Sequence, residues 1–181
     1  MDYRTSVAAQ IRAGNTGAPS IEGLAARYNS ISHDLGGFRE RLRPGAFEKA
    51  LREQHDVRAL VNHDPSLLLG RTKSGTLRLW DTPEGLAFRV ELPDTQYGHD
   101  VYEAIKRGDM DQCSFSFRVD EGAEDWTTEK IDPDSGEVDP EDGEASSIRA
   151  LRSVRLFDVS AVTYPAYEST RVKATPPISV S

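Results

Sequence analysis

The chain has 181 residues, a formal net charge of −8 and 37% hydrophobic residues. This length fits one compact domain, and no apolar run approaches the roughly 20 residues that a membrane helix needs. The N-terminus lacks the apolar stretch of a signal peptide, so we expect a cytosolic protein that does not bind membranes. The single cysteine, Cys113, excludes an internal disulfide, and the lack of a basic stripe argues against nucleic-acid binding.

In chain order, the sequence predicts a flexible arm over 1–20, a folded domain over 21–170 and a disordered tail over 171–181. Apolar alternation bounded by turn residues predicts strands over 21–28, 57–61, 76–80, 86–92, 113–119 and 148–163. Helical spacing predicts helices over 45–54 and 99–107, the second ending at Gly108. Short strands with few helices indicate a β-rich α+β fold, namely a mostly antiparallel β-barrel covered by a few helices.

The acidic residues are concentrated in one segment. Residues 120–144 hold 12 of the 30 acidic residues and one of the 22 basic residues, which leaves 18 acidic and 21 basic residues elsewhere. Because the segment is rich in Pro, Gly and Ser and has little apolar periodicity, we predict an acidic mobile loop over 120–147. Its DPDSGEVDPEDGE text does not have the spacing of a calcium loop, since Gly136 stands where a ligand belongs.

Four histidines supply candidate bases, and each is followed by Asp: His33, His55, His63 and His99. No pair has the short spacing of a zinc signature, so we expect neither a metal nor another cofactor. His63 lies in LVNHDPSLLLGR, at the end of a predicted strand, where its neighbours can hold the ring in one orientation. From these residues alone, His63 is either a turn histidine or a general base.

The predicted strand over 113–119 alternates between two faces. Cys113, Phe115 and Phe117 share the face that we expect in the core, where Cys113 acts as a small buried residue. Ser114 and Ser116 share the other face, roughly 6.5–7 Å apart, so one histidine can engage only one of them directly. They are either ordinary solvent-facing serines, or one of them is a nucleophile.

Asp158 interrupts the apolar strand VRLFDVSAV. A lone carboxylate at such a position destabilises the fold unless another group pairs with it. That group could be His63 or a structural arginine such as Arg118 or Arg155, and composition does not choose between them.

Taken together, the segments resemble the HK97-type prohead protease family. The resemblance covers roughly residues 21–170, and its motifs occur in the order of the family. The matching text is GGFRERLRPGAF (36–47), LVNHDPSLLLGRTKSGTLRL (60–79), EGLAFRVELPDT (84–95), IKRGDMDQCSFSFRV (105–119) and FDVSAVTYPAY (157–167).

The resemblance implies a fold similar to that of the herpesvirus capsid-maturation proteases. It also implies a catalytic serine at Ser114, a histidine base at His63 and an acidic residue at Asp158, with His99 as the fallback for the third role. Ser116 departs from the glycine that relatives often carry there. By analogy with the herpesvirus enzymes, a turn at Gly70–Arg71 would supply the oxyanion donors.

The implied activity is that of a serine endopeptidase. It would cleave the scaffold protein, or the scaffolding segment of the major capsid protein, and also itself, during prohead maturation. It would act in the host cytoplasm inside the assembling procapsid, with a capacity for self-association. Two alternatives stay open: an inactive relative that serves as a scaffold- or capsid-binding assembly module, and a metal-dependent hydrolase, which sensitivity to chelators would reveal.

Overall fold

The computed structural model describes residues 2–6, 19–132, 135–164 and 173–174, and its strands form three sheets. The five-stranded sheet has the order β1-β8-β11-β4-β5, with bounds Asp2–Ser6, Gln112–Val119, Val154–Val162, Arg58–Val61 and Asp64–Arg71. The four-stranded sheet has the order β12-β2-β7-β6, with bounds Lys173–Ala174, Ser20–Arg27, Gly85–Glu91 and Leu77–Thr82. The three-stranded sheet has the order β3-β10-β9, with bounds Arg39–Leu42, Glu144–Leu151 and Glu124–Ile131.

Strands account for 50% of the residues and helices for 12%, which confirms the β-rich prediction. The strand pairs are antiparallel except β11 with β4 and β10 with β3. Across the described residues the strands do not close into a barrel, so that part of the prediction is wrong. Alternation in a sequence identifies the buried face of a strand, whereas closure depends on register and strand tilt, which alternation does not encode.

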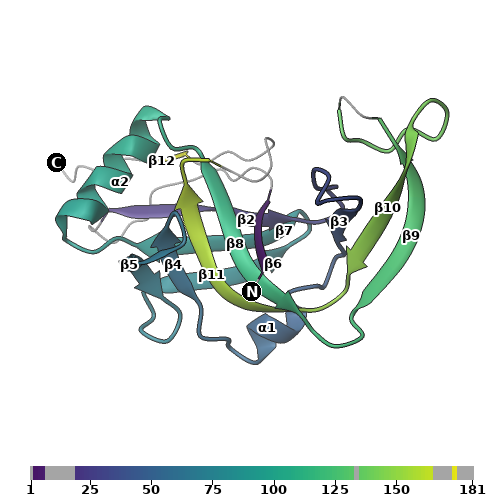
Figure 1. Cartoon of the computed structure of the whole chain (residues 1–181). Coiled ribbons are helices and arrows are strands. Elements are labelled where there is room, and N and C mark those ends of the chain that lie inside the picture. Colours follow the sequence, from purple (N-terminus) through teal and green to yellow (C-terminus); the bar gives the residue numbers. More distant parts are fainter. Residues whose placement is uncertain (1, 7–18, 133–134, 165–172, 175–181) are drawn as a thin grey trace.

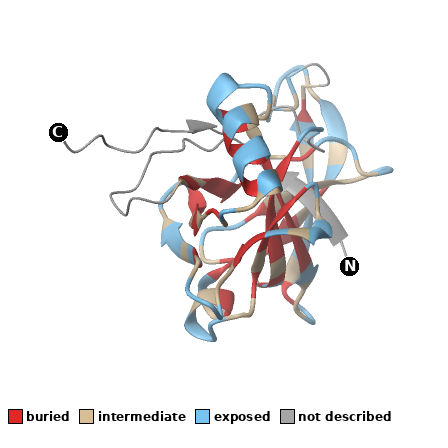
Figure 2. Cartoon of the chain, turned by 90° about the vertical axis from the view of Figure 1, so that its left-hand side faces the viewer, coloured by how far each residue is buried: buried red, intermediate tan, exposed pale blue. Residues whose placement is uncertain are grey.

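The core confirms the predicted inward residues. Cys113, Phe115 and Phe117 are at most 1% exposed, and the two phenylalanine rings stack with centroids 5.1 Å apart. Buried residues gather between the sheets, while the helices present an exposed outer side (Figure 2). Helix α1 is short, Glu48–Arg52, against the ten residues predicted.

Helix α2, Gln96–Arg107, has clear start and stop signals. The side chain of Thr95 accepts a hydrogen bond from the Gly98 N–H, and Gly108 ends the helix with φ +82°, as predicted. Its apolar side is buried through Val101, Tyr102 and Ile105. Within the described residues, no helix has the length and apolarity that a membrane crossing requires.

Four strands form one long two-stranded ribbon, which Figure 1 shows curving from the body of the molecule to a projecting hairpin. β8 pairs with β11 and β9 pairs with β10, both antiparallel. At the junction, the Asp120 N–H donates to the Ser153 carbonyl and the Arg152 N–H donates to the Ala123 carbonyl. The predicted loop over 120–147 is therefore corrected, because β9 and the first half of β10 lie within it, and the single strand predicted over 148–163 is divided between β10 and β11.

The two ends of the chain also differ from the prediction where they are described. Within the arm predicted over 1–20, Asp2–Ser6 forms β1 and pairs with β8, because a strand can add to an open sheet edge. Within the tail predicted over 171–181, Lys173–Ala174 pairs with β2. The rest of both predicted segments lies outside the described residues, apart from Pro19 and Ser20.

Candidate active site

The site begins with the register of β8 and β11. In this antiparallel pair, Ser114 stands opposite Ser160 and Ser116 stands opposite Asp158. Residues two apart on a strand point to the same face, so the four polar side chains share one patch. A register shift between Leu156 and Asp158 precedes the patch on β11.

His63 reaches this patch from a tight turn. β4 and β5 are joined by Asn62 and His63, whose φ angles are +50° and +58°. Two consecutive positive φ angles are typical of a two-residue type I′ hairpin turn, in which Asn is favoured and His is tolerated. The turn is held to the end of β11, because the Asn62 N–H donates to the Ala161 carbonyl and the Asn62 Oδ1 accepts from the Thr163 N–H, both at 2.8 Å.

The imidazole of His63 bridges two of the predicted residues. Its Nε2 lies 2.6 Å from Ser114 Oγ, and its Nδ1 lies 2.6 Å from Asp158 Oδ1. The structure thus brings together Ser114, His63 and Asp158 from three different strands or turns. This is the geometry of a nucleophile, a base and a group that orients the base.

The remaining hydrogen bonds indicate the tautomer of His63. Ser160 has one hydroxyl proton, and it donates that proton to Asp158 Oδ1 at 2.8 Å. A carboxylate only accepts, so in this arrangement the proton between His63 and Asp158 lies on Nδ1. The lone pair of Nε2 then accepts the hydroxyl proton of Ser114, as a general base requires.

The patch is withdrawn from water. Ser114 is 1% exposed and Asp158 is 6% exposed, whereas the side chain of His63 keeps 17% exposure. Buried polar groups destabilise a fold unless they are hydrogen-bonded, and these form a connected set.

Two predicted alternatives are not part of this geometry. His99 lies on α2 and pairs with Asp94 at 2.8 Å, so the partner of His63 is Asp158 rather than a second histidine. Among the described residues, the hydrogen bonds and ion pairs of Asp158 involve His63, Ser116 and Ser160, with no contribution from Arg118 or Arg155.

The sequence does not predict the part that Ser160 takes in the site, and it offers Ser116 only as an alternative nucleophile and as a departure from the glycine of relatives. Both hydroxyls donate to Asp158, Ser116 to Oδ2 and Ser160 to Oδ1. A signal was present, because S-x-S at 114–116 and D-x-S at 158–160 each place two polar residues on one face of a strand. Pairing the two strands would have brought the four side chains together.

The remaining candidates for nucleophile and oxyanion donor are also resolved. Burial raises the pKa of the Cys113 thiol far above its ordinary value, so this cysteine is an inert core residue. Gly70 and Arg71 do not form the expected turn but lie in β5, paired with Ala59 and Arg58. The Arg71 N–H donates to Thr76 Oγ1, which leaves it no role as an oxyanion donor.

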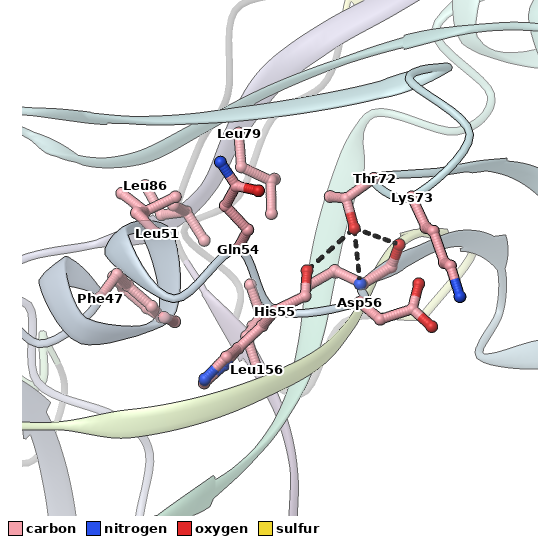
Figure 3. Close-up of a pocket in the computed structure, with 12 residues that line it drawn as sticks. Phe47, Leu51, Gln54, His55, Asp56, Thr72, Lys73, Leu79, Leu86 and Leu156 are labelled. Carbon is pink, nitrogen blue, oxygen red and sulfur yellow. Dashed lines mark hydrogen bonds between the residues drawn. The ribbon is translucent and has the colours of Figure 1, made fainter.

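A second histidine lies in a different setting. His55 lines a cavity of about 570 Å³ that Phe47, Leu79 and Leu86 also line (Figure 3). Its Nε2 lies 3.3 Å from Glu53 Oε2, and among the described residues its buried Nδ1 has no hydrogen-bond partner. No member of the Ser114 patch lines this cavity.

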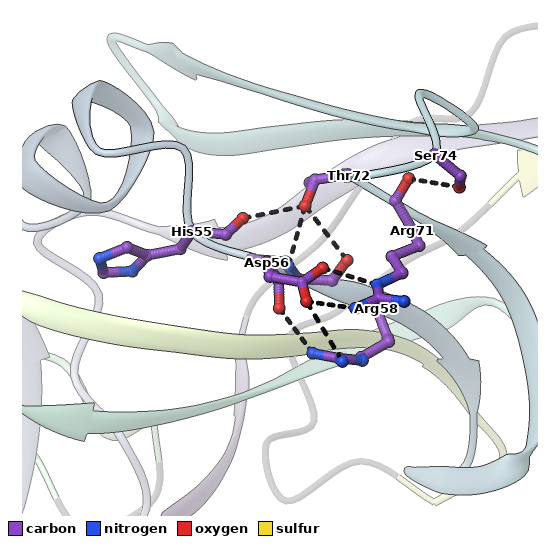
Figure 4. A network of polar contacts seen from close by, with 7 residues as sticks. His55, Asp56, Arg58, Arg71, Thr72 and Ser74 are labelled. Carbon is purple, nitrogen blue, oxygen red and sulfur yellow. Dashed lines mark hydrogen bonds and ion pairs between the residues drawn. The ribbon is translucent and has the colours of Figure 1, made fainter.

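The carboxylate next to His55 has other partners. Figure 4 shows the His55 ring pointing away from Asp56, whose carboxylate accepts from Arg71 and pairs with Arg58 at 3.3 Å. The hydrogen bond from Arg71 holds the pKa of Asp56 below its usual value. In the part of the chain that the structure describes, no three His, Cys, Asp or Glu residues are grouped to hold a metal ion.

Comparison with known proteins finds a family model and a solved structure that match this chain. A family model described as caudovirus prohead serine protease matches residues 5–178. The bacteriophage T4 capsid assembly protease gp21 is 13% identical, with a TM-score of 0.49 over 91% of this chain and 100% of that one. No curated protein sequence matches.

Proposed function

This chain belongs to the caudovirus prohead serine protease family, and we propose that Ser114, His63 and Asp158 form its catalytic triad. The observation that carries the proposal is the double contact of one imidazole, 2.6 Å to the Ser114 hydroxyl and 2.6 Å to the Asp158 carboxylate. The Nδ1–H tautomer leaves the other ring nitrogen ready to accept a proton.

The mechanism follows from these contacts. His63 Nε2 takes the hydroxyl proton as Ser114 Oγ bonds to the carbonyl carbon of the scissile peptide. Asp158 stabilises the imidazolium, which then gives its proton to the leaving amine as the C–N bond breaks. Water, deprotonated by His63, cleaves the acyl ester in the same way and frees Ser114.

The substrate that we propose is the scaffold protein or the scaffolding segment of the major capsid protein, together with this chain itself. The proposal draws support from the family, whose members are prohead proteases. We further propose that the enzyme self-associates inside the procapsid, and that its fold is related to that of the herpesvirus capsid-maturation proteases.

The test is co-expression with the major capsid protein of the same phage, followed by measurement of the intact mass of both chains. Wild type should shorten the capsid protein, and Ser114→Ala should leave it at full length. Ser32→Ala is a matched control, because Ser32 is also buried, at 4% exposure, and its hydroxyl donates to the His33 carbonyl and accepts from the Glu40 N–H, both outside the patch.

Each rival has its own outcome in this experiment. A full-length capsid protein with wild type and with Ser114→Ala alike would favour the inactive assembly module. Cleavage that a chelator stops and Ser114→Ala does not would favour a metal-dependent hydrolase. Either result would overturn the proposed triad.

A further inference from the structure

We propose that Ser116 and Ser160 are positioning residues that hold the Asp158 carboxylate against His63. The inference rests on the proposed function of the triad, and it assigns a role to two hydroxyls that the mechanism itself does not use. Neither serine contributes its oxygen to a bond that forms or breaks.

The contacts of the carboxylate support this role. Asp158 Oδ1 accepts from His63 Nδ1 at 2.6 Å and from Ser160 Oγ at 2.8 Å, while Oδ2 accepts from Ser116 Oγ. Three donors therefore surround one carboxylate from three segments, β11 itself, the neighbouring β8 and the turn after β4. With both oxygens engaged, the carboxylate cannot rotate without breaking at least one of these bonds.

Burial makes the two hydroxyls necessary for this orientation. Asp158 is 6% exposed, Ser116 is 0% exposed and Ser160 is 2% exposed, so little water can replace a lost donor. No arginine or lysine pairs with Asp158 among the described residues, and a buried carboxylate without enough donors is costly. Removing one hydroxyl therefore frees one oxygen to turn away from His63.

Ser160 has a second effect on the histidine. Its Oγ lies 3.3 Å from His63 Nδ1 while its proton goes to Asp158. Because the Ser160 hydroxyl proton is donated to Asp158, Ser160 Oγ can only accept a hydrogen bond from His63 Nδ1. This favours the tautomer with the proton on Nδ1. Ser116 acts on the carboxylate alone, so the two serines should differ in their effect on the ring.

The experiment uses the full chain and diisopropyl fluorophosphate, a small reagent that phosphorylates an activated serine hydroxyl and releases fluoride. The rate of inactivation is measured against reagent concentration to separate the limiting rate, kinact, from the binding constant, KI. We expect Ser116→Ala and Ser160→Ala each to lower kinact about tenfold with KI unchanged, the loss typical of one hydrogen bond to a charged group.

Two further variants separate positioning from folding. Ser32→Ala removes a buried hydroxyl outside the patch and should keep the wild-type kinact. Ser116→Cys keeps the shape of the side chain with a somewhat larger terminal atom but offers only a weak S–H donor, so its kinact should fall even if Ser116→Ala fails to fold. Wild-type kinact in both Ser116→Cys and Ser160→Ala would overturn the inference.

A spectroscopic readout works without activity. The proton on His63 Nδ1 should give a far-downfield NMR resonance that His63→Ala removes, and Ser160→Ala should shift it more than Ser32→Ala does. If wild type does not react at Ser114, the proposed function fails while the resonance still reports on positioning. If wild type reacts and both serine variants match it in rate and in resonance, only the positioning role fails.

Discussion

The two halves of the long ribbon have the same antiparallel pairing and very different surroundings. In the β8–β11 half, both faces are buried, including Ser114 and Asp158. In the β9–β10 half, the buried residues are only Ile131, Ile148, Ala150 and Leu151, and Trp126 is 54% exposed. The two halves thus have the same backbone pairing but differ in how far water is excluded from their polar side chains.

In the β8–β11 half, which lies in the body of the molecule, the exclusion of water strengthens a few polar contacts. A hydrogen bond in a low-dielectric interior is electrostatically stronger than in water, and an unpaired polar group there is costly. Here the polar side chains are connected by hydrogen bonds, so that each buried group has a partner. The connected residues are Ser114, His63, Asp158, Ser116 and Ser160.

In the β9–β10 half, which we call the distal half, ion pairs between charged side chains at the surface stabilise the strands. Arg41 makes a two-point contact with Glu129 across the sheet, at 2.6 and 2.9 Å. Arg149 pairs with Glu40 at 3.1 Å and lies 6.0 Å from the centre of the Trp126 ring. The low hydrophobicity of this segment therefore does not prevent strand formation. Ion pairs and the hydrogen bonds to a neighbouring strand stabilise it in place of a second buried face.

The largest effect that we expect separates two histidines. His63→Ala should lower turnover on the order of 10⁶-fold, because a triad base and its nucleophile act as a unit. His55→Ala is the matched control: its side chain is 13% exposed against 17% for His63, but its ring pairs with Glu53 rather than with a serine. Cleavage of the co-expressed capsid protein measures both, and equal losses would show that burial of a histidine, rather than its partners, explains the first result.

A smaller loss is expected for the orienting residue. Asp158→Asn keeps the shape of the side chain but presents an amide, which can favour the wrong tautomer of His63, and comparable changes lower kcat about 10⁴-fold. The rate of capsid-protein cleavage in a quantitative time course measures the loss. Activity near that of wild type would contradict the account of Asp158 and would revive the search for a different third residue.

In the distal half, we expect effects on stability with no direct effect on the triad. Ile148 is 0% exposed, so Ile148→Ala should lower the free energy of unfolding by about 2–5 kcal/mol. Replacing the hairpin tip, residues 132–143, by a short Gly-Ser bridge should cost far less, since most of the described tip is partly or fully exposed. Urea unfolding compares the two, and a larger loss from the tip would show that the tip packs.

The smallest effect is a pH response of the distal half. The hydrogen bond from Arg41 lowers the pKa of Glu129, so the ion pair stabilises the fold above the unfolded pKa of about 4.3 and is lost as pH falls through the lower folded value. In a Trp80→Phe background, Trp126 fluorescence should change below about pH 4. Glu129→Gln should reduce that change, and an identical titration in this variant would contradict the assignment.

Much of the fold could be predicted from local patterns. The strand over 113–119 and the helix ending at Gly108 were evident from alternation and from a glycine suited to positive φ. The β9–β10 hairpin was missed because composition favoured a loop and the stabilising pairs join residues far apart in the sequence. The β5 strand was missed because its first half is exposed and begins directly after the two-residue turn.

The site was predictable to a different degree. The assignment of Ser114, His63 and Asp158 rests on the family resemblance, since the residues alone are equally consistent with a turn histidine and with an Asp158 that pairs with a structural arginine. The roles of Ser116 and Ser160 depend on the register between β8 and β11, and a shift of one residue would have turned these side chains to the other face. Register of this kind is a property of the folded sheet and is not visible in either strand alone.

The most direct test of the central claim is to locate the serine that becomes phosphorylated. The purified chain is treated with diisopropyl fluorophosphate, digested and analysed by mass spectrometry. The account predicts one adduct, on Ser114, in wild type and in His55→Ala, and none in His63→Ala. An adduct on Ser116 or Ser160, or an adduct on Ser114 that forms equally fast without His63, would contradict it.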